Sequence, residues 1–138
     1  MFVSSGVYLA ICPTPLVEAE EGDEVTLQCR LDPPIDLTDY TLDLVRVDLN
    51  EIVYAYRDKK HLYEAQVKRY RNRTTINLDG LTRGEMTLRI SSVQQDENGL
   101  YRCYVPDLKA RCTMNVTVGE HAVFNIEHFS VFNLNSIE

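Results

Sequence analysis

The sequence predicts an all-β fold, a sandwich of two sheets built from nine to ten short strands. Apolar and polar residues alternate with a period of two over most of the chain, and no long helical pattern interrupts them. Turn residues recur about every 8 to 12 residues, a spacing typical of a sandwich. Tyr101 stands two residues before Cys103 and follows a turn that ends in Gly99. In such a corner the tyrosine hydroxyl can bond the preceding backbone while the cysteine faces the core.

Ten segments show the alternation or the residue types expected of strands. Pro13 and Pro15 break the first of them, because proline cannot donate to a β ladder, and a second half-strand follows. The segment 64–68 is the weakest and is expected at a sheet edge. The expected strands are residues 7–12, 16–20, 25–29, 41–47, 52–57, 64–68, 73–78, 85–91, 99–105 and 112–118.

The composition excludes several classes of function. A net charge of −7 disfavours nucleic acid, because binding phosphates requires clustered cations. Four cysteines and the sequons at Asn72 and Asn115 indicate the secretory pathway and predict N-linked glycans. No Cys-X-X-Cys pair is present and the histidines lie far from zinc-binding spacings, so no metal and no cofactor are expected. No catalytic motif or phosphate loop occurs, so the chain is not expected to be an enzyme or to take a small-molecule substrate.

One domain is expected over residues 7–119. Residues 1–6 form a short N-terminal segment, for which a leader remnant and the start of the first strand both remain open. Residues 120–138 are expected to form a stalk or tail, with a further strand as the alternative. No segment approaches the roughly 20 apolar residues that span a bilayer, so membrane attachment would depend on an anchor absent from this chain.

Several motifs resemble the immunoglobulin V-set domain, and within that class the butyrophilin and myelin-oligodendrocyte-glycoprotein group. They are VYAYRD at 53–58, YRNRT at 70–74, LTRGEMTLRI at 81–90 and YRCYVP at 101–106. The resemblance implies antiparallel sheets with Greek-key connections, and a disulfide between Cys29 and Cys103, which lie 74 residues apart. It also implies that the second half-strand runs parallel to the last strand, which would bring Cys12 to Cys112. A second disulfide is expected there; two free thiols, or a Cys112 that is free to form a dimer, are the alternatives.

The resemblance also assigns structural roles. Arg73 is expected to pair with Asp96 and close the base of the sandwich, beside the corner of Gly99 and Tyr101. V-set domains usually pack a tryptophan on the central disulfide, but this chain has none, and Leu44 stands at that position. The usual packing of the core is therefore not expected.

Outward residues of the central strands are candidates for binding a partner. If Tyr101 and Cys103 face inward, Arg102 and Tyr104 face outward, beside the outward residues of the strand at 41–47. Tyrosine and arginine are enriched at binding hot spots. An ordinary strand surface is the alternative, and a glycan on Asn115 would move the binding surface to the loops at 31–39 and 58–63. The candidate partner-binding residues are Val45, Val47, Tyr54, Tyr56, Arg102 and Tyr104.

The family resemblance implies a function on the external side of the plasma membrane. Relatives of this kind suggest a ligand for a protein receptor on T cells or other leukocytes, which regulates their activation and cytokine production. Self-association through the same sheet, in homophilic cell adhesion, is the alternative. A receptor ligand should stay monomeric alone, whereas an adhesion module should self-associate.

Overall fold

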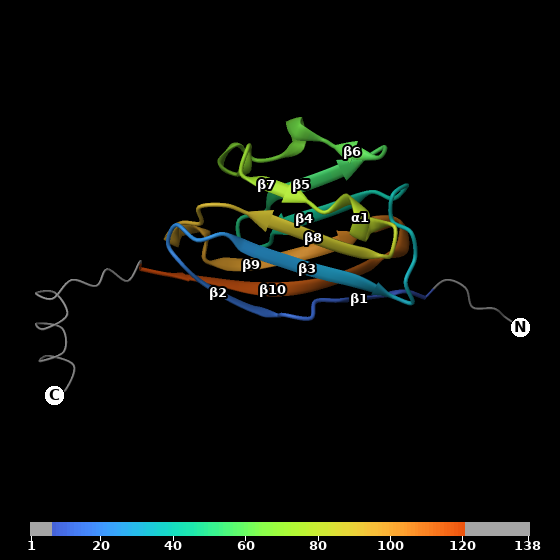
Figure 1. Cartoon of the computed structure of the whole chain (residues 1–138), viewed down its shortest axis with the longest axis horizontal. Coiled ribbons are helices and arrows are strands. Elements are labelled where there is room, and N and C mark those ends of the chain that lie inside the picture. Colours follow the sequence, from blue (N-terminus) through green and yellow to red (C-terminus); the bar gives the residue numbers. More distant parts are fainter. Residues whose placement is uncertain (1–6, 121–138) are drawn as a thin grey trace, which may run out of the picture.

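The computed structural model describes residues 7–120, and within them ten strands form two sheets packed face to face (Figure 1). The strands are β1 (Leu9–Ile11), β2 (Leu16–Glu20), β3 (Val25–Asp32), β4 (Leu42–Arg46), β5 (Glu51–Arg57), β6 (Lys60–His61), β7 (Thr74–Ile76), β8 (Glu85–Ile90), β9 (Gly99–Val105) and β10 (Ala110–Gly119). One sheet has the order β1-β3-β8-β7 and the other the order β2-β10-β9-β4-β5-β6. The predicted all-β sandwich is confirmed. The predictions for residues 1–6, and those for the tail from 121 onward, lie outside the described residues.

Two disulfides join the sheets. Neighbouring strands run antiparallel, except that β2 runs parallel to β10. Because β2 follows directly after β1 in the chain, this pairing brings the end of β1 close to β10. Cys29 bonds to Cys103 and Cys12 to Cys112, as the family resemblance implied. Cys103 and Cys112 lie directly opposite each other on β9 and β10, so the two bridges leave the six-stranded sheet side by side.

The core lies between the sheets and contains no tryptophan. Burial alternates without a break along all eight residues of β3, so the period of two in the sequence corresponds to the inward face. Leu44 is 1% exposed and lies opposite Cys103. Met86 lies opposite Cys29 and places its sulfur 3.5 Å from the sulfur of Cys103. A leucine and a methionine thus surround the disulfide that a tryptophan usually covers in this class of domain.

The edge beyond β5 differs from the prediction. The segment 64–68 is not a strand. It runs from the 3-10 turn Tyr63–Ala65 to the 3-10 turn Lys68–Tyr70 with two residues between them, and the short strand β6 precedes both turns. Gln66 is buried, and its side-chain amide donates to the backbone carbonyl of Val53 at 2.8 Å. A side-chain hydrogen bond from Gln66 therefore contacts β5 at the edge where backbone pairing with a further strand was expected. A four-residue helix, α1 (Leu78–Leu81), then follows β7.

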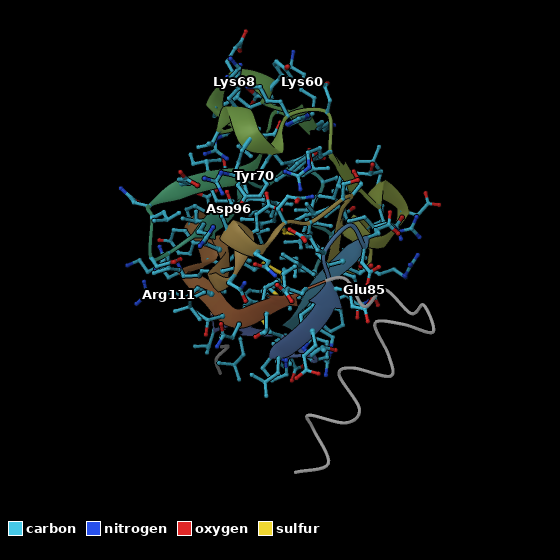
Figure 2. The ribbon with its side chains drawn as sticks, turned by 90° about the vertical axis from the view of Figure 1, so that its left-hand side faces the viewer. Lys60, Lys68, Tyr70, Glu85, Asp96 and Arg111 are labelled. Atoms are coloured by element: carbon cyan, nitrogen blue, oxygen red, sulfur yellow. A yellow bond between two sulfur atoms is a disulfide. The ribbon has the colours of Figure 1, made fainter. Side chains whose placement is uncertain are left out.

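Residues 68–73 contain four basic side chains, and three of them bond other parts of the fold. Arg69 and Arg73 contact carboxylates of the 3-10 turn Gln95–Glu97, and Arg71 donates to backbone carbonyls of the turn before it. Lys68 is the exposed cation of the four and projects into solvent (Figure 2). The run is therefore structural rather than a free basic surface.

Buried tyrosines predict alkaline sensitivity. Burial raises the pKa of Tyr54 from 10.0 to about 12 and also raises the pKa values of Tyr70 and Tyr101. The folded state therefore holds these protons more tightly than the unfolded state, so their stabilising contribution is complete below pH 10 and is lost above it. We expect the free energy of unfolding to fall between pH 10 and about pH 12.

Tyrosinate absorbance measures this directly, because no tryptophan overlaps it. The buried tyrosines should ionise only as the protein unfolds. Ionisation of all eight tyrosines near pH 10 in protein that is still folded by circular dichroism would contradict the prediction.

Candidate functional site

The corner before β9 is held by two tyrosine hydroxyls and one glycine. The hydroxyl of Tyr101 donates to the backbone carbonyl of Glu97 at 2.7 Å, which is the bond expected from the sequence, and lies 3.0 Å from the hydroxyl of Tyr70. A Cβ at Gly99 would lie 2.6 Å from Nε of Arg46. Any other residue would therefore displace Arg46 from the base of the sandwich.

The predicted ion pair between Arg73 and Asp96 is wrong. Arg73 instead makes a bidentate pair with Glu97, with both N–O distances at 2.8 Å. The 3-10 turn Gln95–Glu97 points Glu97 inward, where it is 2% exposed, and leaves the side chain of Asp96 72% exposed. Hydrogen bonding to Glu97 raises the pKa of Arg73, so the pair favours the charged form of this guanidinium.

A second arginine at the base was missed by the sequence analysis. Arg46 is 4% exposed, donates to the backbone carbonyls of Asp96 and Asn98, and lies 3.1 Å from the carboxylate of Asp48. The sequence did contain an indication of this position. Arg46 lies two residues after the inward Leu44, so the alternation of the strand directs it inward as well. Both arginines are bonded within the fold, so their role at the base is structural.

The candidate site is the outer surface of the six-stranded sheet. We call it the front face and define it as Val45, Arg102, Tyr104, Arg111 and Thr113. Arg102 lies between Val45 and Thr113, directly opposite both, and Tyr104 lies opposite Arg111. All five side chains are half-buried or exposed. The structure therefore brings three of the predicted partner-binding residues together and adds Arg111 and Thr113, which the alternation along β10 could have revealed.

The front face is cationic although the chain is acidic. The guanidinium of Arg102 lies 5.9 Å from the ring centre of Tyr104, and its Nε is buried without a hydrogen-bond partner among the described residues. Arg111 is exposed and projects from the margin of the molecule (Figure 2). Asp43, opposite Tyr104, is already paired with Arg57 at 2.9 Å. The face therefore offers guanidinium donors and an aromatic ring to carboxylates and carbonyls of a partner.

Tyr54 and Tyr56 do not belong to this face, contrary to the prediction. They are 4% and 2% exposed and lie opposite Leu44 and Leu42, whose side chains face the core. The hydroxyl of Tyr56 donates to the backbone carbonyl of Thr38 at 3.0 Å. The two tyrosines are therefore core residues and cannot reach a partner.

The remaining candidates lie at one end of the sheet. Val47 is half-buried just past β4, and its N–H donates to the carbonyl of Leu100 at 2.8 Å. Asn115 is exposed and lies opposite Leu100, whereas Arg111 and Tyr104 lie four residues further along the strands. Four residues of strand span about 13 Å. A glycan on Asn115 would therefore border Val47 and leave the arginine-rich end of the front face open.

The other sequon lies away from the front face. Asn72 is exposed in the turn before β7 and has a left-handed backbone, with φ of 65°. Glycosylation at both sequons remains a prediction.

Residues 7–120 provide neither a metal centre nor a membrane span. Within that range no group of three or more histidine, cysteine, aspartate or glutamate side chains could hold a metal ion. The helices described there are all too short to cross a bilayer.

Comparison with known proteins identifies the family. The family model of the immunoglobulin V-set domain matches residues 12–126. The chain belongs to the immunoglobulin V-set family. Myelin-oligodendrocyte glycoprotein from Pongo abelii is 32% identical over 103 residues, and butyrophilin subfamily 2 member A2 from Homo sapiens is 31% identical over 100 residues. These alignments cover 75% and 72% of this V-set chain but only 42% and 19% of the two relatives, so the chain spans less than half of their length.

Solved structures share the V-set fold. Bovine butyrophilin superposes with a TM-score of 0.76 at 22% identity, covering 84% of this chain and 56% of that one. The IgV-like domain of human B7-H4 gives 0.64 at 22% identity, covering 82% of this chain and 96% of that domain. A chain from the complex of ICOS with ICOS-L and a VNAR domain gives 0.66 at 23% identity, covering 84% of this chain and 58% of that one. At these identities the likeness is one of fold.

Proposed function

We propose that this V-set domain is an extracellular recognition module, displayed on the external side of the plasma membrane. Its front face binds a protein receptor on T cells or other leukocytes and thereby regulates their activation and cytokine production. The relationship to butyrophilin and to myelin-oligodendrocyte glycoprotein supports this proposal, as does the fold shared with B7-H4 and with the ICOS complex. V-set domains are typically recognition modules rather than enzymes, and no catalytic role is proposed.

The observation that carries the proposal is Arg102. Its Nε is buried without a hydrogen-bond partner among residues 7–120, and its guanidinium is fixed against Tyr104. Removing a guanidinium donor from water without a partner is unfavourable. The terminal nitrogens of Arg102 are not buried and make no hydrogen bond within residues 7–120, so a carboxylate or carbonyl from another protein can pair with them. Arginine beside tyrosine on a half-buried surface is also the composition of a binding hot spot.

The test is to stain resting and activated T cells with a multimer of the whole chain secreted from animal cells. We expect saturable staining that falls at least about ten-fold in the double variant Arg102→Ala/Tyr104→Ala, since hot-spot truncations commonly have effects of this size. Arg111→Glu, at an exposed position, should weaken staining as well, because it reverses one charge of the face without touching the core.

The matched control is Arg30→Ala, which removes an exposed arginine from β3 on the opposite sheet. Its staining should equal that of the unaltered chain. Unstained cells together with aggregation of beads coated with the domain would overturn the proposal and favour homophilic adhesion. Equal losses in all three variants would show that the front face is not the contact surface.

A further inference from the structure

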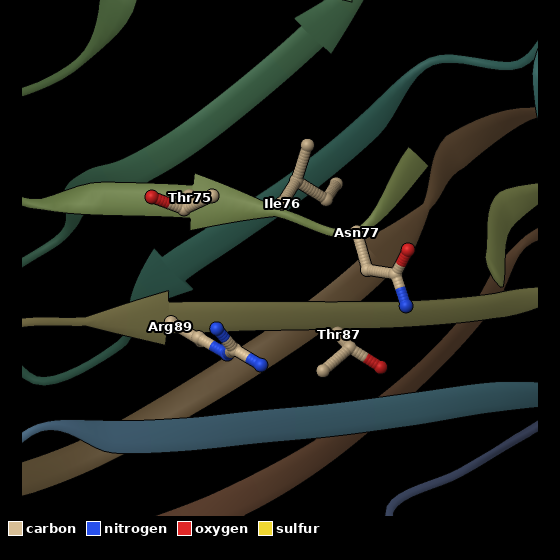
Figure 3. A pocket seen from close by; sticks show the side chains of 5 residues that line it. All are labelled: Thr75, Ile76, Asn77, Thr87 and Arg89. Carbon is tan, nitrogen blue, oxygen red and sulfur yellow. The ribbon is translucent and has the colours of Figure 1, made fainter. Parts of the chain in front are cut away.

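The four-stranded sheet carries a pocket on its outer surface, on the opposite side of the sandwich from the front face (Figure 3). It has a volume of about 320 Å³ and is open to solvent. β7 and the residue after it provide one wall, and β8 provides the other. The lining residues are Thr75, Ile76, Asn77, Thr87 and Arg89.

Hydrogen-bond donors of this pocket are unused. Arg89 is exposed, and its guanidinium makes no hydrogen bond or ion pair within the described part of the chain. The side-chain oxygen of Asn77 accepts from the N–H of Asp79 at 3.1 Å, which leaves the amide nitrogen free. Figure 3 shows that this nitrogen is directed toward β8, near Thr87, and that Arg89 lies beside Thr87 on the same strand. No carboxylate lines the pocket, so nothing within it neutralises the guanidinium.

The surroundings of the pocket are polar. Glu85, two residues before Thr87 on β8, is paired with Arg83 at 3.5 Å. Thr26 and Gln28 of β3 lie opposite Arg89 and Thr87 and extend the same surface. No aromatic ring lines the pocket, and its single aliphatic lining residue is Ile76. Such a surface provides little apolar contact for a hydrophobic peptide side chain. Its hydroxyl and amide groups can form hydrogen bonds with the hydroxyls of a sugar. The chain as a whole carries a charge of −7, so an anion would be held by local contacts rather than by general attraction.

We propose that this pocket binds an acidic saccharide. The carboxylate or sulfate group of the sugar pairs with Arg89, and its hydroxyls bond Thr75, Thr87 and the amide nitrogen of Asn77. An exposed arginine forms a weak pair by itself, so the affinity is low for a single sugar and rises when several domains are displayed together. The site lies on the other sheet from the front face, so a glycan and a protein receptor could be bound at the same time.

The experiment is saturation-transfer NMR on the whole chain, treated with sialidase so that any glycan on its sequons carries no sialic acid. The probes are 3′-sialyllactose for the carboxylate, N-acetylglucosamine 6-sulfate for the sulfate, and lactose as the neutral reference. We expect saturable transfer to at least one acidic probe and a signal at background for lactose. Arg89→Gln should reduce the acidic signal to the level of lactose, and Thr87→Val should reduce it several-fold.

Arg30→Gln is the matched control, because it removes an exposed arginine of the same sheet that does not line the pocket. Its signal should equal that of the unaltered chain. Absence of transfer to both acidic probes would overturn the proposal, and so would equal transfer in Arg89→Gln and the unaltered chain. Receptor staining by the Arg89→Gln multimer should be unchanged, so failure at this site and failure at the front face can be told apart.

Discussion

Replacing Glu97 with alanine is expected to lower the free energy of unfolding by about 3 kcal/mol, because breaking a buried ion pair leaves its partner uncompensated. Glu97 is 2% exposed and binds both terminal nitrogens of Arg73 at 2.8 Å. Its carboxylate also accepts from the backbone N–H of Gln94 at 3.0 Å, which closes the turn before β9. Without the carboxylate, the guanidinium of Arg73 loses its counter-charge and keeps only backbone carbonyls as acceptors, and this N–H loses its acceptor.

Urea unfolding of three variants separates the causes. Glu97→Gln keeps the shape of the side chain and removes its charge, so its loss should be smaller than that of Glu97→Ala. Asp96→Ala is the matched control, since the side chain of Asp96 is 72% exposed and substitutions at such positions usually cost no more than about 0.5 kcal/mol. A loss at Asp96 as large as the loss at Glu97 would mean that the base is closed in a different way.

The comparison between these two acidic residues also marks a limit of the sequence analysis. The motif predicted a carboxylate for Arg73, and the base of the sandwich does contain one. Which of two adjacent acidic residues faces inward depends on the 3-10 turn Gln95–Glu97. Asp96 and Glu97 are both acidic, so the pattern of apolar and polar residues is the same whichever of them faces inward. The partner of Arg73 could therefore not be identified from the pattern alone.

A similar ambiguity placed Tyr54 and Tyr56 on the wrong face. Four consecutive residues of β5, from Val53 to Tyr56, are buried, so the strand shows no alternation from which its inward face could be assigned. A bulge between Leu44 and Val45 further shifts the pairing of β4 with β5. The alternation was intact in β9, and there the inward and outward residues were predicted correctly.

The segment after β5 was mispredicted for a different reason. Its contacts depend on the side chain of Gln66 and on single backbone bonds, such as the one from Val67 to Ile52 at 2.9 Å. A glutamine amide that replaces a ladder bond is specified by tertiary packing, which residue propensities do not describe. The fold was therefore predictable for strands that bury one face and expose the other. The residues of the front face were predictable only on strands of that kind.

Removing the Cys29–Cys103 disulfide is expected to cost more than removing the Cys12–Cys112 disulfide, although the latter encloses more of the chain. The two bridges are nested, so each closes only a short additional loop once the other is present. Cys29 follows Cys12 by 17 positions, and Cys112 follows Cys103 by nine. Chain entropy assigns about 3 kcal/mol to a loop of this size, so entropy hardly distinguishes the two bridges.

Burial does distinguish them. Cys29 and Cys103 are 3% and 1% exposed and pack against Leu44 and Met86, whereas Cys12 and Cys112 are only partly buried. Replacing the inner pair by alanines leaves a cavity that the rigid core fills poorly, which adds about 1 kcal/mol or more. We therefore expect losses of about 4 kcal/mol for the inner pair and about 3 kcal/mol for the outer pair.

Guanidinium unfolding of the two double-alanine variants tests this order. The dependence of the free energy on denaturant should steepen in both, because each unfolded chain exposes more surface when a loop is opened. Equal losses would mean that the core collapses around Met86 and fills the cavity. A larger loss for the outer pair would mean that the bridge between β1 and β10, rather than the buried one, holds the two sheets together.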